Sequence, residues 1–385
     1  MNVGIYIQVP FCQTKCTYCN FHTGVFAHSL YDPYASVVCR ELAERAALYG
    51  DADAALEANF TVDTVYIGGG TPSLLTSATL ARILDAARVS FRCRFEEVTL
   101  EADPETVTPE KAAAWRAAGI NRVSLGAQSF SDAELVAAGR MHRSADISAA
   151  TRALRDAGIA NIGFDLIAGL PHQTAESWED SLRQLLGLRP AHASIYLLEI
   201  DEGSRLGREA LAGGSRYSAD RLPSDDAMAG FYEAACTLLV QHAYEHYEIS
   251  NWALPGFRSR HNVKYWRREP YLGFGAGAHS FDGRERWANV HDPAAYVAAI
   301  ETGRLPVEQR QRVTPAQALE EELFLGLRQL EGIELDRIEK QYNANLRPRF
   351  ERLREAGLVE FDGTRTRLAA SRLTVANEVF VELLG

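Results

Sequence analysis

The sequence predicts an α/β fold: a partial barrel of six β-strand–α-helix repeats, followed by a small winged-helix-like α+β domain at the C-terminus. Three observations lead to this prediction. In the first two thirds of the chain, short apolar runs alternate with stretches of helical periodicity, which indicates βα units and a parallel sheet. Glycines and unusual polar residues follow these runs directly, where parallel strands place functional loops. From about Thr314 the pattern changes to three short helices and a hairpin.

The predicted strands and helices alternate along the chain. The strands are expected at 3–9, 64–67, 98–101, 122–128, 162–167 and 193–200. The helices between them are expected at 34–48, 79–91, 109–118 and 178–186. Thr108 stands where an N-cap is needed, and Pro109 fits the first helical turn. Ser131 and Glu134 have the spacing of a capping box, which predicts a further helix start.

The rest of the chain divides less clearly. Residues 206–223 are rich in Gly, Ser and Arg and are predicted to form a loop or an excursion from the barrel, and a helix is expected at 226–241. Residues 245–300 are rich in aromatic residues and glycine, without clear periodicity. The C-terminal pattern predicts helices at 319–329, 335–342 and 346–356, and hairpin strands at 358–361 and 366–368. The expected domains are therefore 1–225, 226–310 and 311–385.

Composition excludes some classes of function. With 46% hydrophobic residues among 385, the chain can bury a sizeable core. Its net charge of −11 opposes nucleic acid as a partner, because phosphate binding needs a basic surface. No apolar run reaches the roughly 18 residues of a transmembrane helix. Met1 leads directly into a strand-like segment, without the pattern of a signal peptide. A cytoplasmic protein is expected.

Three cysteines near the N-terminus are the strongest chemical signal in the chain. Cys12, Cys16 and Cys19 form a Cys-x3-Cys-x2-Cys loop. Cysteine thiolates hold iron–sulfur clusters, usually four for each cluster, so three would leave one iron open to another ligand. A structural zinc site needs four ligands, and His22 is the near candidate for a fourth. The other cysteines, Cys39, Cys93 and Cys236, stand among apolar residues and are expected in the core.

This loop, with the aromatic Tyr18 beside its last cysteine, closely resembles that of radical S-adenosylmethionine (SAM) proteins. The resemblance implies a 4Fe–4S cluster on Cys12, Cys16 and Cys19, with SAM on the open iron. It also implies the partial (β/α)6 barrel of that superfamily. A cluster of this kind fits a reducing compartment.

Further strand ends resemble the SAM-binding positions of the same superfamily. The turn GGGTP at 68–72 matches the one that faces the methionine part of SAM, and glycine allows a close backbone approach. An arginine fits a carboxylate bidentately, and an acid at a strand end can accept from ribose hydroxyls. The SAM contacts that the resemblance implies are Gly69, Gly70, Thr71, Glu101, Gln128, Arg140 and Asp165.

Four motifs together resemble the oxygen-independent coproporphyrinogen III oxidase superfamily: YIQVPFC (6–12), GGGTP (68–72), SLGAQSF (124–130) and FDLIAGLP (164–171). The resemblance covers nearly the whole chain and adds Tyr6 to the implied cofactor contacts. The coproporphyrinogen III dehydrogenases of this superfamily carry another cysteine just after the third ligand, and a longer N-terminus. Here Asn20 and Phe21 stand at that place, and eleven residues precede Cys12. This departure puts porphyrinogen decarboxylation in doubt.

The segment HNVKYW at 261–266 resembles the His-Asn-x-x-Tyr-Trp marker of HemW-type haem chaperones. The resemblance implies haem as cargo, delivered to apo-haemoproteins such as respiratory cytochromes. Imidazole is a common axial haem ligand, so His261 is a candidate, while Tyr265 and Trp266 offer flat faces to a porphyrin. In the alternative, His261 and His279 form hydrogen bonds within a loop and the aromatic residues fill the core. Haem is expected to bind outside the SAM pocket.

Two other functions remain open on the sequence. One is the oxidative decarboxylation of coproporphyrinogen III. The other is a DNA-binding regulator that uses the arginines of the C-terminal domain, although Glu351 and Glu355 balance that helix and the net charge opposes it. The expected partners are haem and apo-haemoproteins, with no nucleic acid. Peripheral membrane association and a homodimer are left open.

Overall fold

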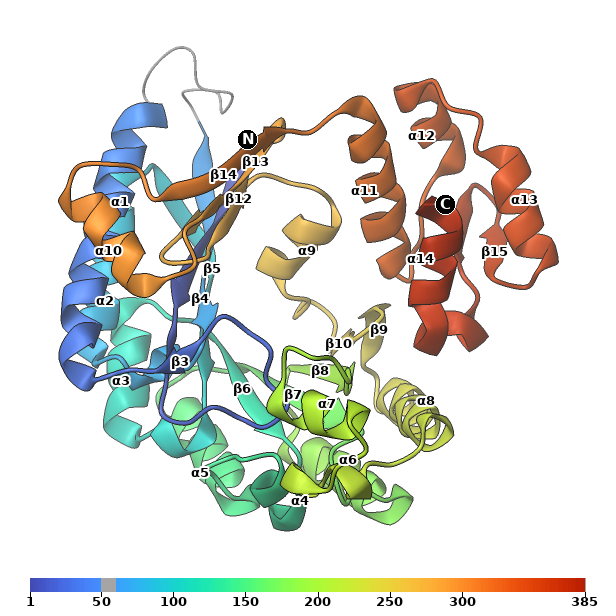
Figure 1. Ribbon diagram of the computed structural model, residues 1–385, viewed down its shortest axis with the longest axis horizontal. Coiled ribbons are helices and arrows are strands. Elements are labelled where there is room, and N and C mark those ends of the chain that lie inside the picture. The colour runs from blue at the N-terminus through green and yellow to red at the C-terminus, as the bar shows by residue number, and fades with distance from the viewer. Residues whose placement is uncertain (50–59, 385) are drawn as a thin grey trace.

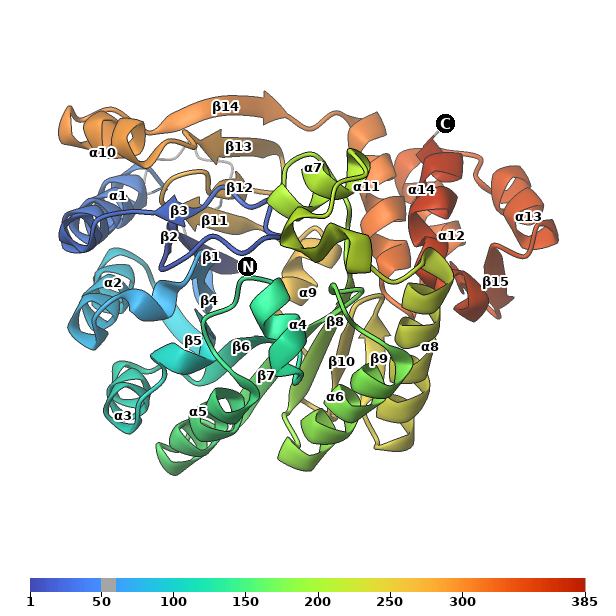
Figure 2. The ribbon, with the colours of Figure 1, turned by 60° about the horizontal axis from the view of Figure 1, so that its bottom comes forward.

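A curved sheet, lined with helices on its outer side, forms the body of the molecule (Figures 1 and 2). The computed structural model describes residues 1–49 and 60–384. Six strands lie parallel and next to one another in chain order. They are β1 (Asn2–Val9), β4 (Thr61–Gly69), β5 (Cys93–Ala102), β6 (Arg122–Gln128), β7 (Asn161–Ala168) and β8 (His192–Leu197). This order, with a helix after each strand, is consistent with the predicted six-repeat partial barrel.

The helices that connect these strands lie in an arc on the outer side of the sheet (Figure 2). They are α1 (Tyr31–Tyr49), α2 (Ser77–Ser90), α3 (Pro109–Ala118), α5 (Ser144–Asp156), α6 (Ala175–Leu188) and α8 (Asp225–Gln241). Successive side chains of a strand point to opposite faces of the sheet, so every second residue packs against these helices. Ile5, Ile7, Val65 and Ile67 are fully buried, whereas the residue between the last two, Tyr66, lines the cavity on the other face. Apolar side chains therefore hold the layers together and leave the inner face to polar groups.

Residues 245–300, which showed no clear periodicity, widen the sheet at both edges together with β14, which follows them. At one edge β11 (Tyr271–Phe274) pairs in parallel with β1, followed by antiparallel β12 (His279–Phe281), β13 (Glu285–Asn289) and β14 (Val307–Arg312). At the other edge β10 (Asn251–Ala253) and β9 (Glu245–Glu248) continue from β8. Helix α9 (Arg260–Trp266) contacts β4, and α10 (Pro293–Glu301) contacts α1.

The predicted start of α3 is confirmed, but the capping box at Ser131 is wrong. The Thr108 hydroxyl accepts from the Lys111 amide at 3.2 Å, with Pro109 in the first turn. Helix α4 (Asp132–Ala137) does begin after Ser131, yet the Ser131 side chain makes no capping bond. Glu134 accepts instead from the Ser129 hydroxyl at 2.6 Å and from Gln173 at 3.1 Å. A buried tertiary network has replaced the local bond.

Of the predicted loop or excursion at 206–223, the loop is wrong, because the segment has helical structure. It contains helix α7 (Arg205–Leu211) and a 3-10 segment, η4 (Arg216–Arg221). The Ser204 hydroxyl caps α7 by accepting from the Gly207 amide at 2.8 Å. Fully buried Leu206 joins a small core with Leu170 and Leu198. Burial of one leucine thus orders a segment whose composition is typical of a loop.

The C-terminal domain has the predicted three helices and hairpin, plus a last helix. They are α11 (Pro315–Arg328), α12 (Leu335–Tyr342), α13 (Arg347–Glu355), β15 (Val359–Asp362), β16 (Arg365–Leu368), η5 (Ala370–Val375) and α14 (Ala376–Leu384). Helix α14 packs on α11 through an edge contact of Phe324 with Phe380, ring centroids 4.8 Å apart. The domain docks beside α9 (Figure 1), where Glu321 binds both Arg268 and Arg286.

The arginines of α13 that suggested DNA binding serve this domain itself. Arg347 pairs with Asp336, and Arg354 pairs with Glu351. Arg349 donates to the Leu383 carbonyl at 2.6 Å. These contacts support the interpretation of a balanced helix face. Among the described residues, no helix is long and apolar enough to cross a membrane.

Candidate functional site

A cavity of about 460 Å³ opens where the carboxyl ends of the parallel strands meet the N-terminal cysteine loop. This volume is in the range of small-molecule sites. The wall is built by period-two alternation along the strands, with the cysteine loop across the mouth. From the strands, the lining includes Tyr66, Gly69, Gly70, Glu101, Asp103, Arg122, Ser124, Gly126, Gln128, Asp165, Ser194 and Tyr196.

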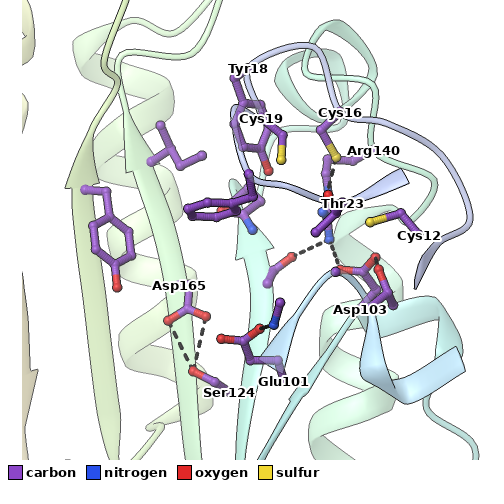
Figure 3. A pocket seen from close by; sticks show the side chains of 18 of the residues that line it. Cys12, Cys16, Tyr18, Cys19, Thr23, Glu101, Asp103, Ser124, Arg140 and Asp165 are labelled. Atoms are coloured by element: carbon purple, nitrogen blue, oxygen red, sulfur yellow. Dashed lines mark hydrogen bonds and ion pairs between the residues drawn. The ribbon is translucent and has the colours of Figure 1, made fainter. Parts of the chain in front are cut away.

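All three predicted cysteines line this cavity (Figure 3). Cys12 ends the short strand β2 (Phe11–Cys12), which pairs with β3 (Gly24–Val25). The loop between them is anchored at Thr17, whose amide donates to the Ala138 carbonyl at 3.0 Å and whose carbonyl accepts from the Leu206 amide at 2.8 Å. The fold therefore holds the loop from two other elements, and each thiol is partly exposed.

The thiol arrangement fits a cluster better than a single ion. Among the described residues, no three His, Cys, Asp or Glu side chains converge where one metal ion could bind. A zinc ion would need such convergence, whereas the irons of a cluster take separate thiolates. Nearby, an added Cβ at Gly70 would lie 2.4 Å from the Phe11 carbonyl oxygen and 3.0 Å from the Cys12 sulfur. Only glycine fits between the loop and the end of β4.

Glu101 lies at the floor of the cavity. Its two oxygens accept from the Tyr66 hydroxyl at 2.8 Å and from the Gly69 amide at 2.9 Å. Burial raises the pKa of Glu101 to about 7, against the lowering effect of these two hydrogen bonds. Gly69 has a φ of 112°, which glycine adopts readily. The predicted GGGTP turn and the predicted acid are thus one hydrogen-bonded unit.

Arg140 joins the cysteine loop to the strand ends. It forms a close ion pair with Asp103, donates to the Gly126 carbonyl at 3.0 Å, and reaches the Cys16 sulfur at 3.5 Å (Figure 3). Burial opposes its charge, but Asp103 and Tyr18 outweigh that effect and raise the pKa of the guanidinium. Asp103 also accepts from Thr71 at 3.2 Å. A fixed positive charge therefore lies beside one of the thiols.

Asp165 and Gln128 lie on neighbouring strands. The Ser124 hydroxyl lies 3.2 and 3.1 Å from the two Asp165 oxygens, and burial raises the pKa of this carboxyl although Ser194 and Arg122 oppose the shift. Gln128 ends β6 with a φ of 62°, a left-handed conformation that is uncommon for a non-glycine residue. Both side chains belong to the cavity lining, as the sequence predicted.

Tyr6 is not among the residues that line the cavity. Its hydroxyl donates to Gln8 at 2.6 Å, and its ring stacks on Tyr66 with centroids 6.0 Å apart. It therefore lies beside Tyr66 on the inner face of the sheet. Conversely, sequence reasoning missed the lining residues Tyr66, Asp103, Ser124 and Tyr196. Asp103, Ser124 and Tyr196 each stand two positions from another residue that lines the cavity, so period-two alternation was the signal that could have found them. Tyr66 has no lining residue at that spacing.

The predicted haem segment forms α9, and its histidine faces inward. His261 is fully buried. Its Nδ1 lies 2.9 Å from the Thr64 hydroxyl and its Nε2 lies 2.9 Å from the Tyr265 hydroxyl. Burial lowers the pKa of His261 to about 3, with a smaller contribution from Lys264. Both ring nitrogens of His261 are occupied, as the alternative interpretation expected. That interpretation also expected a loop and hydrogen bonds at His279, whereas the segment is a helix and the His279 side chain forms no hydrogen bond within the described residues.

The expected separation of this segment from the SAM pocket is only partly right. Asn262, the second residue of the motif, lines the cavity, whereas His261, Tyr265 and Trp266 do not. The His261 ring packs on Tyr66, with centroids 5.4 Å apart. Trp266 meets Tyr247 edge-on at 5.8 Å. Helix α9 thus packs against the inner face of the sheet beside the cavity, where His261 contacts Thr64 and Tyr66 of β4.

Comparison with known proteins identifies the family to which this chain belongs. Residues 6–185 match the radical SAM superfamily, and residues 313–370 match the HemN C-terminal domain. "Heme chaperone HemW" of Bacillus subtilis is 33% identical over 386 residues, which covers 99% of this chain and 98% of that protein. The chain belongs to the HemW family of radical SAM proteins. HemW of Mycobacterium tuberculosis H37Rv is 35% identical, covering 99% of this chain and 95% of that protein.

The fold of the HemW family member described here also matches a solved structure. Coproporphyrinogen III oxidase (HemN) from Escherichia coli, described as a radical SAM enzyme, superposes with a TM-score of 0.83. The match covers 99% of this chain and 89% of that one. At 21% identity, it shows a shared fold and carries no statement about activity.

Proposed function

We propose that this protein binds haem and delivers it to apo-haemoproteins, and that it carries a 4Fe–4S cluster and SAM in the cavity at the strand ends. The observation that carries the proposal is the match to relatives named heme chaperones along nearly the whole chain. The cysteine loop and the cavity support the cofactor part. Respiratory cytochromes are the proposed recipients, and the cytoplasm the proposed compartment.

The cavity residues suit these cofactors. In our proposal Cys12, Cys16 and Cys19 hold three irons, and the cluster, when bound, supplies an electron to SAM. In our proposal the turn of Gly69, Gly70 and Thr71, which lines the cavity, contacts SAM. Its two glycines let the turn pack closely against Gln8 and the Phe11 backbone. The lining acids Glu101 and Asp165 provide negative charge for a ligand that carries a positively charged sulfur.

Arg140 and Gln128 complete the proposed SAM site. The Arg140 guanidinium lies against Cys16, so its positive charge faces a sulfur that in our proposal binds iron. Its fork is also suited to a carboxylate. Gln128 presents an amide from a backbone held in an uncommon conformation, as residues at ligand sites often are.

The role of His261, Tyr265 and Trp266 as haem contacts stays a prediction. Iron coordination by His261 would break its bonds to Thr64 and Tyr265 and would need α9 to move. In the described conformation this segment supports Tyr66, which in turn binds Glu101. We therefore propose that it first shapes the cofactor cavity.

Coproporphyrinogen III dehydrogenase activity is the competing function. The shared fold with HemN favours considering it, but Asn20 stands where the dehydrogenases are expected to carry a further cysteine. We expect no vinyl products from coproporphyrinogen III when SAM and a reductant are supplied. Product formation at a catalytic rate would overturn the chaperone proposal.

Haem titration of the reconstituted protein tests the proposal itself. Haem added in steps should give a saturable Soret band. The haem-loaded protein should then transfer haem to an apo-cytochrome faster than haem-loaded albumin does. A protein that gives no stable Soret band is not a haem chaperone.

A further inference from the structure

Three exposed histidines gather beside the cysteine loop, outside the predicted haem motif. His22 follows Cys19 by three positions, His279 begins β12, and His291 comes two residues after β13. The His22 and His291 ring centroids lie 4.4 Å apart, and those of His279 and His291 lie 6.4 Å apart. The fold thus brings together imidazoles that are more than 250 residues apart in sequence.

These three imidazoles differ from the buried histidines. His142, His192 and His261 are fully buried, and each has a ring nitrogen in a hydrogen bond. Within the described part of the chain, no side-chain hydrogen bond forms at His22, His279 or His291, and all three are exposed. Their ring nitrogens are therefore free to take a ligand from solvent.

The backbone holds two of the three rings in place. Gly277 has a φ of 72°, and a Cβ added there would lie 3.0 Å from the His291 Nδ1. The Gly277 amide donates to the Val290 carbonyl at 2.9 Å, which ties the β11–β12 turn to the segment of His291. His279 pairs with Ala288 across β12 and β13. The positions of His279 and His291 thus follow from the sheet.

The surroundings of His22 suit a flat apolar ligand that carries acid groups. Phe21 is 68% exposed and Val25 is 61% exposed, so two apolar side chains are open to solvent beside His22. The Lys15 ammonium donates to the carbonyls of Phe21 and Thr23 at 2.6 and 3.1 Å, on both sides of His22. It adds a positive charge at the same surface.

The arrangement selects haem over a bare metal ion. No three of these side chains converge as a chelate for one ion in the part of the chain that the structure describes. A haem iron already has four porphyrin nitrogens and needs only one or two axial ligands, which a neutral imidazole supplies. Exposed apolar groups can cover the ring, and the positive charge of Lys15 nearby favours the negative propionates.

We propose that His22, His279 and His291 form the haem-iron binding site, with His291 between the other two. This inference rests on the proposed haem function and names its ligands. Because His22 belongs to the loop of the three cysteines, haem would bind at the rim of the cofactor cavity, lined by Phe21. The cluster loop and the cargo would then share one segment, 12–25.

The test compares haem binding by the full-length reconstituted protein and by the triple variant His22→Ala, His279→Ala, His291→Ala. The triple variant should lose haem affinity on the order of tenfold or more and lose the Soret and EPR signature of imidazole-ligated ferric haem. The single variant His291→Ala should show a smaller loss in the same direction. His172→Asn is the matched control, because His172 is exposed, lies on another loop and has a φ of 68°, which asparagine tolerates.

The outcomes separate this inference from the proposed function. A SAM-induced EPR change in the triple variant shows that the cavity is intact; if that variant fails to fold, His291→Ala decides. Wild-type haem affinity and an unchanged Soret spectrum in these variants would overturn the three-histidine site but not the proposed haem binding. If only His261→Ala then lost haem affinity, the iron ligand would lie on α9. A wild-type protein that binds no haem overturns both proposals.

Discussion

Glu101 is the residue at which burial and proposed function meet most directly. Its pKa is raised to about 7 because the carboxyl is buried. A raised acid pKa means that the folded protein binds a proton more tightly than the unfolded chain does. The contribution of Glu101 to the free energy of unfolding is therefore lost as pH rises from about 4.5 through 7. A bound cation would offset this loss by stabilising the ionised carboxylate.

We predict that SAM binds several fold more tightly at about pH 7.5 than at about pH 6, since the ionised Glu101 attracts the cationic ligand and is populated above its pKa. Equilibrium dialysis at both pH values measures the change. The Glu101→Gln variant should bind weakly with a flatter pH profile, whereas Glu110→Gln, on the exposed first turn of α3, should match the wild type. An unchanged wild-type affinity would show that Glu101 does not face the charge of SAM.

At the scale of elements, the end of β4 and the cysteine loop are packed too closely for a side chain. We predict that Gly70→Ala reduces iron loading and lowers stability by about 1–3 kcal/mol, because the added Cβ meets the Phe11 backbone. Iron analysis and thermal unfolding measure the two effects. Gly187→Ala is the control, since nothing lies within 4 Å of its added Cβ and alanine favours the helix. Full iron loading in Gly70→Ala would mean that the loop can shift without loss.

Helix α9 and β4 depend on the bond between Thr64 and His261. We predict that Thr64→Val costs about 1–3 kcal/mol, because it leaves a buried ring nitrogen without a partner. The midpoint of urea unfolding measures this cost. Thr61→Val, on the same strand but only partly buried and without a side-chain hydrogen bond in the described structure, should change it little. Equal midpoints for the two variants would show that the bond contributes nothing to stability.

The elements that sequence predicted well are those fixed by local signals. Thr108 and Pro109 mark a helix start that needs no tertiary partner, and the strands from β1 to β8 follow from apolar runs. Ser131 failed because Glu134 is bound by Ser129 and Gln173, which is 39 residues away along the chain from Glu134. The segment at 206–223 failed because Leu206 is buried by distant residues. Such partners cannot be read from local composition.

At the scale of the molecule, the sequence motifs predicted well which residues line the cavity. They did not predict which side chains pack around those residues. The cysteines, Glu101, Gln128, Arg140 and Asp165 all line it. His261 illustrates the limit, since a motif names the residue but not the direction of its ring, which packing on Tyr66 decides. The trio of His22, His279 and His291 was beyond local reasoning, because sheet pairing at β12 and β13 assembles it.

The central claim is that one cavity holds a three-cysteine cluster and SAM. EPR spectroscopy of the reduced, anaerobically reconstituted protein, before and after SAM is added, tests it most directly. We predict about four irons per chain and a spectrum that changes on addition of SAM, with Cys16→Ser losing the cluster and Cys39→Ser, outside the loop, retaining it. A spectrum that SAM leaves unchanged, or a Cys16→Ser variant with a full cluster, would contradict the account.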